Sequence, residues 1–208
     1  KFLTPKAISD LASTYNATLD YEKKSGKKVF TDDINEDIIA MKPILWQVVV
    51  ALDSQKKNKE TAEVLNSIYQ LDKKDQEKLY FAANYAINAE DYDKALSYLN
   101  ELKAINYTGE GTAYYAKNIA TGQEESFANK ADRDNFVKLG THNTPREEKL
   151  VSKKGEIVKN IALIYVQQGK NEEAKAAIAD ARKSNPNDTS LILTEADLYY
   201  KLNDIPTY

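Results

Sequence analysis

The sequence predicts an all-α fold, a right-handed α-α superhelix of helical hairpins, with a small β-hairpin and helix inserted between two of the hairpins. Three observations lead to this prediction. Segments of the chain resemble one another at a shift of 34 residues, apolar residues within them follow helical spacing, and one stretch of different composition interrupts the period. Self-similarity at a fixed period of about 20 to 50 residues is typical of repeat proteins.

The 34-residue period is clearest where residues 58–72 are aligned with residues 92–106. Small and apolar residues coincide there at intervals of four, three and three, which places them on one face of an α-helix. The aligned residues are Thr61, Leu65, Ile68 and Leu71 with Ala95, Leu99, Leu102 and Ile105. The same shift carries Ala162 onto Ala196, and it carries Tyr165 onto Tyr199. A hairpin of two helices cannot bury its apolar face alone, so successive hairpins are expected to stack.

The N-terminal residues predict the second helix of a partial repeat at about 4–25. The same four-three-three spacing recurs there, with no first helix before it. The residues that carry this spacing are Leu11, Tyr15, Thr18 and Tyr21. A lysine-rich run at 23–28 follows and is succeeded at once by acidic residues, a pattern that favours a solvated connection over a polyanion site.

Two full repeats are expected next, at about 42–75 and 76–109. The repeat at 42–75 is the less regular of the two, because bulky Val49 and polar Thr61 stand where close helix contacts favour small residues. Its register is therefore predicted only to within a residue or so. In the following repeat, Ala83 and Ala95 supply the small residues that helices in close contact require.

An insertion is expected at about 107–154, because the shift between Ala95 and Ala174 is 79 residues, one period plus an additional 45. Aromatic-rich segments at 112–117 and 123–127 flank a loop with Asn and Gly, which predicts a β-hairpin. Residues 130–139 predict a short helix that ends at glycine. Residues 141–149 have turn composition and predict a loop.

The C-terminal part contains a full repeat at about 155–188 and a partial repeat at 189–208. Gly169 and Asn203 are suited to the tight turn inside each hairpin. Pro186 marks the end of one hairpin, since proline stops a helix. Neither end of the chain shows the polar face of a capping repeat, so we expect a segment of a longer array.

At these positions the sequence resembles the tetratricopeptide repeat (TPR) family. The residues that carry the resemblance are Ile161, Ala162, Tyr165, Gly169, Ala174, Ile178, Ala181 and Pro186. The insertion, from Tyr114 through Arg133, the Leu139–His142 run and Pro145 to residues 155–160, is similar to an exported bacterial group of TPR proteins. That resemblance implies a removed signal peptide and a periplasmic or envelope-associated location, with a cytoplasmic location as the alternative. It implies no activity and no catalytic residues.

Composition excludes several classes of function. Cysteine is absent, which removes disulfides and thiolate chemistry. A net charge of −3 does not favour nucleic acid as a partner. No apolar run is long enough to cross a membrane. The single histidine, His142, is expected on the surface without metal-ligand partners. We therefore predict a non-enzymatic protein with no cofactor and no metal site.

Family resemblance implies that the first helices of the repeats line a concave face and contact a peptide or protein segment. An aromatic and aliphatic face suits an apolar or helical segment. Packing against a neighbouring repeat or the insertion explains the aromatic residues equally well, and the insertion itself is either a structural plug or a recognition loop. The alternative function is a structural component of a cell-envelope assembly or a self-associating array; the partner and the oligomeric state are not fixed by the sequence. The candidate contact residues are Trp46, Val50, Tyr80, Asn84, Asn88, Lys159, Leu163, Leu193 and Asp197.

Overall fold

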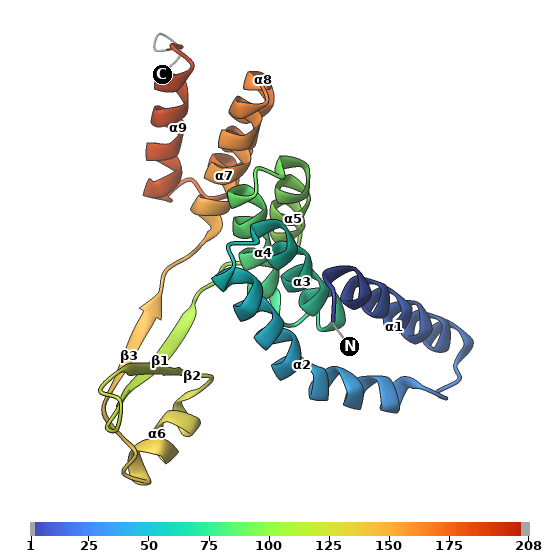
Figure 1. The fold of residues 1–208 in the computed structure, drawn as a ribbon. Coiled ribbons are helices and arrows are strands. Elements are labelled where there is room, and N and C mark those ends of the chain that lie inside the picture. Colours follow the sequence, from blue (N-terminus) through green and yellow to red (C-terminus); the bar gives the residue numbers. More distant parts are fainter. Residues whose placement is uncertain (1–2, 205–208) are drawn as a thin grey trace. The chain divides into compact units, whose positions relative to one another are not determined.

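A computed structural model describes residues 3–204, and the chain divides into two compact units. The helical unit comprises the residues up to Tyr107 and those from Glu156 onward, and the sheet unit comprises Thr108–Gly155 (Figure 1). The helices that lie wholly or almost wholly in the helical unit are α1 (Pro5–Ser25), α2 (Thr31–Ser54), α3 (Asn58–Leu71), α4 (Gln76–Asn88), α5 (Tyr92–Ala104), α7 (Lys154–Gln167), α8 (Asn171–Ser184) and α9 (Thr189–Lys201).

The turns between the two helices of each hairpin, and the turn that follows α9, have the same backbone geometry. Lys56, Glu90, Gly169 and Asn203 all have positive φ, at 56°, 56°, 74° and 54°. In each turn the amide of this residue donates to the carbonyl three residues earlier, as Lys56 does to Asp53. The amide of the following residue donates to the carbonyl five residues earlier, as Lys57 does to Leu52. This is the Schellman pattern that ends a helix on a left-handed residue. Lys56 and Glu90 are 34 residues apart, as are Gly169 and Asn203, so these turns recur at the interval seen in the sequence.

The connection from one hairpin to the next also recurs, except where the insertion follows. The residues after α3 and α8, Asp72 and Asn185, both have φ −138°, and the amide of each donates to the last turn of its helix. After α5 the chain instead forms a left-handed turn at Asn106, with φ 56°. This change of backbone conformation directs the chain out of the repeat and into the sheet unit.

Helix α2 is longer than the first helix of the repeat predicted at 42–75. It begins at Thr31 and continues through Pro43, although an interior proline costs about 3 kcal/mol in a helix. Ile34, Ile38, Leu45 and Val49 are all buried and extend one apolar face on both sides of the proline. Burial of that continuous face offsets the cost, and the repeat boundary at 42 stays a prediction.

Helix α1 packs mainly against α3. Its Asn16 Nδ2 donates to the Gln70 carbonyl at 2.9 Å. Ile8 and Ala12 are the buried side chains of this helix, whereas Tyr21 is 70% exposed. The predicted face through Leu11 and Tyr21 was therefore wrong by about one position around the helix, because tertiary contact with α3 selects the face that is buried.

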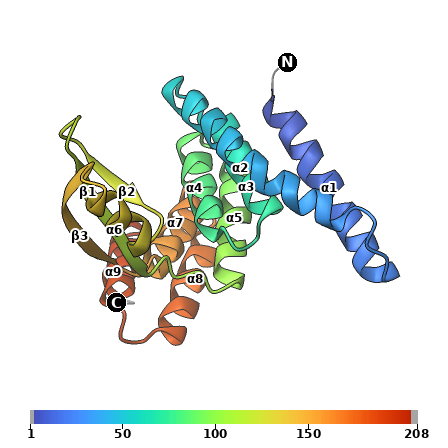
Figure 2. The same cartoon turned by 90° about the horizontal axis from the view of Figure 1, so that it is seen from below.

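The core of the helical unit is continuous from hairpin to hairpin. Helices α3, α4 and α5 lie side by side in both views (Figure 1, Figure 2). Ile157 and Ile161 of α7 join the core of these helices, while Val158 and Ala162 of the same helix join a second cluster with α8 and α9. Ala83 is fully buried where helices approach closely. One helix with two buried faces is the arrangement expected of stacked hairpins.

The sheet unit contains β1 (Gly111–Asn118), β2 (Glu124–Phe127), α6 (Lys130–Lys138) and β3 (His142–Leu150), with antiparallel strand order β2-β1-β3. The predicted β-hairpin and short helix are present. The predicted loop at 141–149 is wrong, because those residues form β3 along β1. Nearly every residue of β3 is exposed, and Pro145 lies within it. Edge strands tolerate proline, and β3 has no alternating apolar pattern, which is why its local composition resembled a loop.

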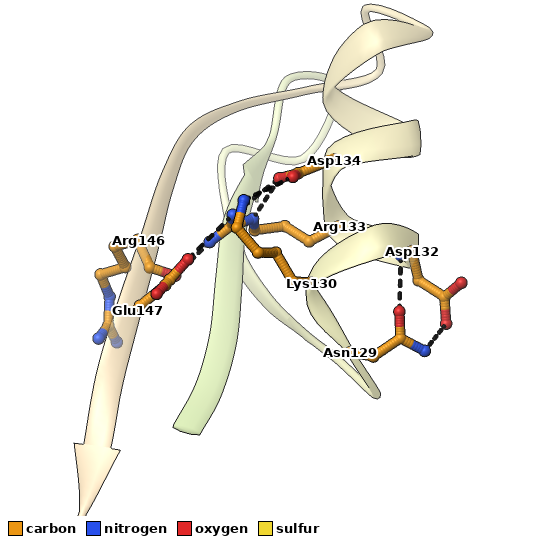
Figure 3. A network of polar contacts seen from close by, with 7 residues as sticks. All are labelled: Asn129, Lys130, Asp132, Arg133, Asp134, Arg146 and Glu147. Carbon is orange, nitrogen blue, oxygen red and sulfur yellow. Dashed lines mark hydrogen bonds and ion pairs between the residues drawn. The ribbon is translucent and has the colours of Figure 1, made fainter. Parts of the chain in front are cut away.

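Polar side chains fill much of the interior of the sheet unit. The guanidinium of Arg133 in α6 is nearly buried; it donates to Asp134 Oδ1 at 2.7 and 2.9 Å, to the Arg146 carbonyl at 3.1 Å and to Glu147 at 3.3 Å (Figure 3). It also lies 5.5 Å from the centre of the Tyr114 ring. These bonds join α6 to β3 and satisfy the charge that burial would otherwise destabilise.

His142 is buried rather than on the surface, so the expectation of a surface histidine was wrong. Its Nε2 lies 3.0 Å from Glu125 Oε2 and its Nδ1 lies 3.0 Å from the Thr141 hydroxyl. The ring centres of Phe127 and Phe136 lie 5.3 and 5.4 Å from the centre of the imidazole, in edge-on contact with it. The hydrogen bond from His142 holds the pKa of Glu125 below its usual range. Both ring nitrogens have polar neighbours, which is typical of a structural histidine.

Candidate protein-binding surface

The predicted contact residues divide by exposure. Trp46 and Val50 of α2 expose 43% and 54% of their surface, and Leu193 of α9 exposes 72%. Those that are exposed or partly exposed are Trp46, Val50, Asn84, Asn88, Lys159, Leu163, Leu193 and Asp197. Only Tyr80 is buried, at 7% exposure.

Tyr80 joins α4 to α7 inside the helical unit. Its hydroxyl donates to Glu156 Oε1 at 2.5 Å, and its ring centre lies 5.9 Å from that of Tyr107. Burial, together with the hydrogen bond to Glu156, raises the pKa of Tyr80 to about 12. Packing between neighbouring repeats therefore accounts for this aromatic residue, and it presents little surface to a partner.

Trp46 lies beside a cation and a second aromatic ring. The Lys78 ammonium of α4 is 5.0 Å from the centre of the Trp46 ring and 5.6 Å from the centre of the Phe81 ring. Lys78 is held there by Asp75 and Glu77, at 3.6 and 3.4 Å. The sequence prediction included neither Lys78 nor Phe81, although both could have been found one helical turn or less from the predicted Tyr80 and Asn84. These contacts extend the exposed surface from α2 to α4.

An apolar stripe runs along the exposed side of α2. We define the α2 stripe as Ile39, Pro43, Trp46 and Val50, all of which are exposed. Their spacing of four, three and four residues places them on one face of the helix. The buried residues of α2 occupy a different face, so this helix is apolar on two sides. A contiguous exposed apolar surface rimmed by polar residues is typical of an interaction site.

Helix α9 exposes a second, smaller apolar surface. Leu193 and Tyr200 are 72% and 73% exposed and are seven residues apart, so they lie on one side of the helix. Asp197 lies between them in sequence and forms an ion pair with Lys201 at 3.1 Å. The predicted Leu193 and Asp197 are thus close together, with the carboxylate already partly neutralised.

Neither a metal-binding cluster nor a helix that could cross a membrane is present among the residues that the structure describes. Within residues 3–204, no group of three or more His, Asp or Glu side chains could hold a metal ion. In the same range, no helix combines the length and the apolar character that crossing a bilayer requires.

Comparison with known proteins gives similarity in solved structures alone. No family model matches the sequence, and no curated protein matches it. A MamA RS-1 double mutant is 12% identical over 95% of this chain and 88% of its own, with a TM-score of 0.43. PilF of Pseudomonas aeruginosa is 15% identical over 95% of this chain and 71% of its own, with a TM-score of 0.44. YrrB, a TPR protein with an unusual peptide-binding site, is 15% identical over 85% of each chain, with a TM-score of 0.27. Because these TM-scores are below 0.5, the repeat architecture rests on the recurring turns of this chain.

Proposed function

We propose that the helical unit is a non-enzymatic protein-interaction scaffold of TPR type, which binds an apolar or helical segment of a partner protein. The proposed repeats are at about 42–75, 76–109 and 155–188, with partial repeats at about 4–25 and 189–208. The recurring turns and the buried small residues at helix contacts support this assignment. An exported location, in the periplasm or at the envelope, is part of the proposal and rests on the sequence resemblance.

The observation that carries the proposal is the exposure of Trp46 within the α2 stripe. A tryptophan that is 43% exposed leaves a large apolar area in contact with water, and Val50 extends it along the same face. Tryptophan is enriched among the residues that dominate protein interfaces. The Lys78 ammonium, 5.0 Å from the ring and paired with Asp75 and Glu77, borders this apolar face with charged groups. The best-matched partner is therefore an amphipathic helix with apolar residues at intervals of three and four.

The single tryptophan of the chain provides a direct test. Peptides would be selected from a random library against the purified protein, and binding of the selected peptides would be followed by tryptophan fluorescence. Covering Trp46 should shift its emission to shorter wavelength and protect it from acrylamide quenching. Trp46→Ala and Val50→Ser should each weaken binding about tenfold, as measured by calorimetry.

Two matched variants separate surface contact from folding. Leu139→Ser changes an apolar residue of the sheet unit that is more exposed than Trp46 and Val50, and it should leave peptide affinity unchanged. Tyr80→Phe changes a buried ring and should lower stability more than affinity. Selected peptides that bind without altering the fluorescence of Trp46 would place the binding site elsewhere and contradict the proposal.

A second candidate is a structural role in a cell-envelope assembly or a self-associating array. Leu193 and Tyr200 favour it, because their exposed side of α9 resembles a face that another helix would cover. Sedimentation equilibrium should then show a dimer or larger species, and Leu193→Ser with Tyr200→Ser should return it to a monomer. A monomer at high concentration would remove the self-association part of this candidate.

A further inference from the structure

The connection between α1 and α2 places exposed apolar side chains among lysines. We define the basic tip as residues 21–30, from the last turn of α1 to the residue before α2. Tyr21, Val29 and Phe30 expose 70%, 65% and 55% of their surface. An open groove of about 470 Å³ adjoins them and extends along α1 to Thr14. Such a cluster on a short connection is not explained by the core of the helical unit.

Four lysines of the basic tip have no acidic partner among the residues that the structure describes. All four are exposed, and within residues 3–204 none of their ammonium groups forms an ion pair with a carboxylate. Other lysines of the helical unit do form such pairs, for example Lys73 with Glu101 at 3.0 Å. Glu22 is the one acidic residue among residues 21–30, so the tip has a formal charge of four minus one, or +3. The four lysines are Lys23, Lys24, Lys27 and Lys28.

Glu22 gives the tip a fixed conformation. Its side chain is 4% exposed and accepts hydrogen bonds from the amides of Val29, Phe30 and Thr31 at 2.9, 2.8 and 3.0 Å. The Thr31 hydroxyl donates to the same carboxylate at 2.6 Å. These bonds satisfy amides at the start of α2 that no intrahelical carbonyl accepts. The backbone of Val29 and Phe30 is therefore held while both side chains remain in solvent.

We propose that the basic tip docks on the surface of an anionic lipid bilayer. A bilayer presents anionic phosphates at its surface and apolar chains directly beneath them, and the tip presents ammonium groups and apolar side chains in one short segment. Lysines would contact the phosphates while Val29 and Phe30 enter the interfacial layer. Asp20, Asp32 and Asp33 flank the tip, so an end-on approach would bring the lysines of the connection to the surface ahead of these carboxylates.

A lipid surface explains the tip better than an acidic protein segment does. An acidic segment would account for the four lysines but not for the exposure of Val29 and Phe30, which an ion-pairing partner leaves in water. A purely apolar protein partner would leave the lysines without counter-charges. Docking of the basic tip on a bilayer is peripheral and does not involve the α2 stripe. An experiment can therefore contradict lipid docking without contradicting the proposed function, and the reverse also holds.

Vesicle flotation tests the proposal on the full chain. Wild-type protein should float with vesicles of phosphatidylcholine and phosphatidylglycerol at low salt, and it should not float with pure phosphatidylcholine. Changing the four tip lysines to glutamine should reduce the bound fraction more than tenfold, since each lysine near an anionic surface contributes roughly fivefold. Val29→Ser with Phe30→Ser should make the remaining binding fully sensitive to salt.

Matched variants control for charge and for apolar area. The charge control changes to glutamine four exposed lysines that lie in other connections or in the last turn of α5, and it should still float. These lysines are Lys56, Lys57, Lys74 and Lys103. Leu139→Ser with Val151→Ser is the apolar control and should also float. Absence of flotation with anionic vesicles, or equal losses in the tip and control variants, would overturn the proposal. Tip-dependent binding to polyglutamate without vesicle binding would assign the tip to an acidic protein instead.

Discussion

Lys56 and Glu90, 34 residues apart, adopt the same left-handed backbone conformation at the turns inside successive helical hairpins, each with φ 56°. Neither is a glycine, and left-handed conformations cost other residues roughly 1 kcal/mol or more. The third hairpin has Gly169 at this place, with φ 74°. The turn is therefore set by the stacking of the helices, and the residue in it adapts to that requirement.

Relief of this backbone strain should stabilise the helical unit. Glu90→Gly is expected to raise the free energy of unfolding by about 0.5 to 1 kcal/mol, because glycine adopts positive φ without a Cβ clash. Gly169→Ala should lower it by about 1 kcal/mol. Nothing lies within 4 Å of a Cβ added at Gly169, so the loss would come from the backbone alone. Urea unfolding monitored by circular dichroism measures both changes, and Glu90→Ala, expected to be near neutral, is the control.

Ala162 and Ala196 are equivalent in sequence but differ in burial. Ala162 is 1% exposed between two helix clusters, whereas Ala196 is partly exposed in α9, the last helix that the structure describes. Ala162→Leu should destabilise the protein by about 1 to 3 kcal/mol through overpacking. Ala196→Leu should change stability by less than about half of that amount. Thermal unfolding compares the two, and equal losses would show that both alanines are enclosed alike.

Stability should fall at alkaline pH as buried tyrosines ionise. Burial and the bond to Glu156 raise the pKa of Tyr80 to about 12, from an ordinary value of 10.0. A group whose pKa is raised by folding contributes stability below its unfolded pKa, and that contribution is lost as pH rises through the folded value. The loss should therefore fall between pH 10 and 12. Tyr80→Phe should reduce the slope of unfolding free energy against pH in that window; an unchanged slope would contradict the assignment.

The hydrogen bonds of Arg133 should stabilise the sheet unit against local opening. Arg133→Lys keeps the charge but cannot reproduce the planar fork that reaches Asp134 and the Arg146 carbonyl. Exchange of the β1 backbone amides should then become at least tenfold faster in NMR experiments. Lys130→Gln is the control, because its pair with Asp134 is exposed and contributes little. Unchanged exchange in Arg133→Lys would mean that the aromatic contacts suffice.

Local patterns were sufficient for the elements that repeat. The 34-residue period located the hairpins, and Gly169 identified the turn geometry that Lys56 and Glu90 also adopt. Local patterns were insufficient for β3, because its exposed and charged residues resemble a loop. Only its pairing with β1 identifies it as a strand. The same limit applies to His142, because nothing nearby in sequence indicates that Phe127 and Phe136 enclose it.

Local patterns were likewise sufficient for some of the candidate contact residues and insufficient for others. Trp46 and Val50 were predicted from their places in the repeat and are exposed, while Tyr80, predicted from the same reasoning, is buried against Tyr107 and Glu156. Repeat position fixes the side of the helix on which a residue lies. It does not fix whether the next hairpin covers that side.

By itself the sequence determined the all-α class and the helical hairpins, because helix periodicity and turn chemistry are local properties of the chain. Tertiary structure alone decided which face of α1 is buried, that residues 142–150 form a strand, and which aromatic residues remain exposed. Each of those outcomes depends on contacts between segments far apart in sequence, whose burial and hydrogen bonding outweigh local preference.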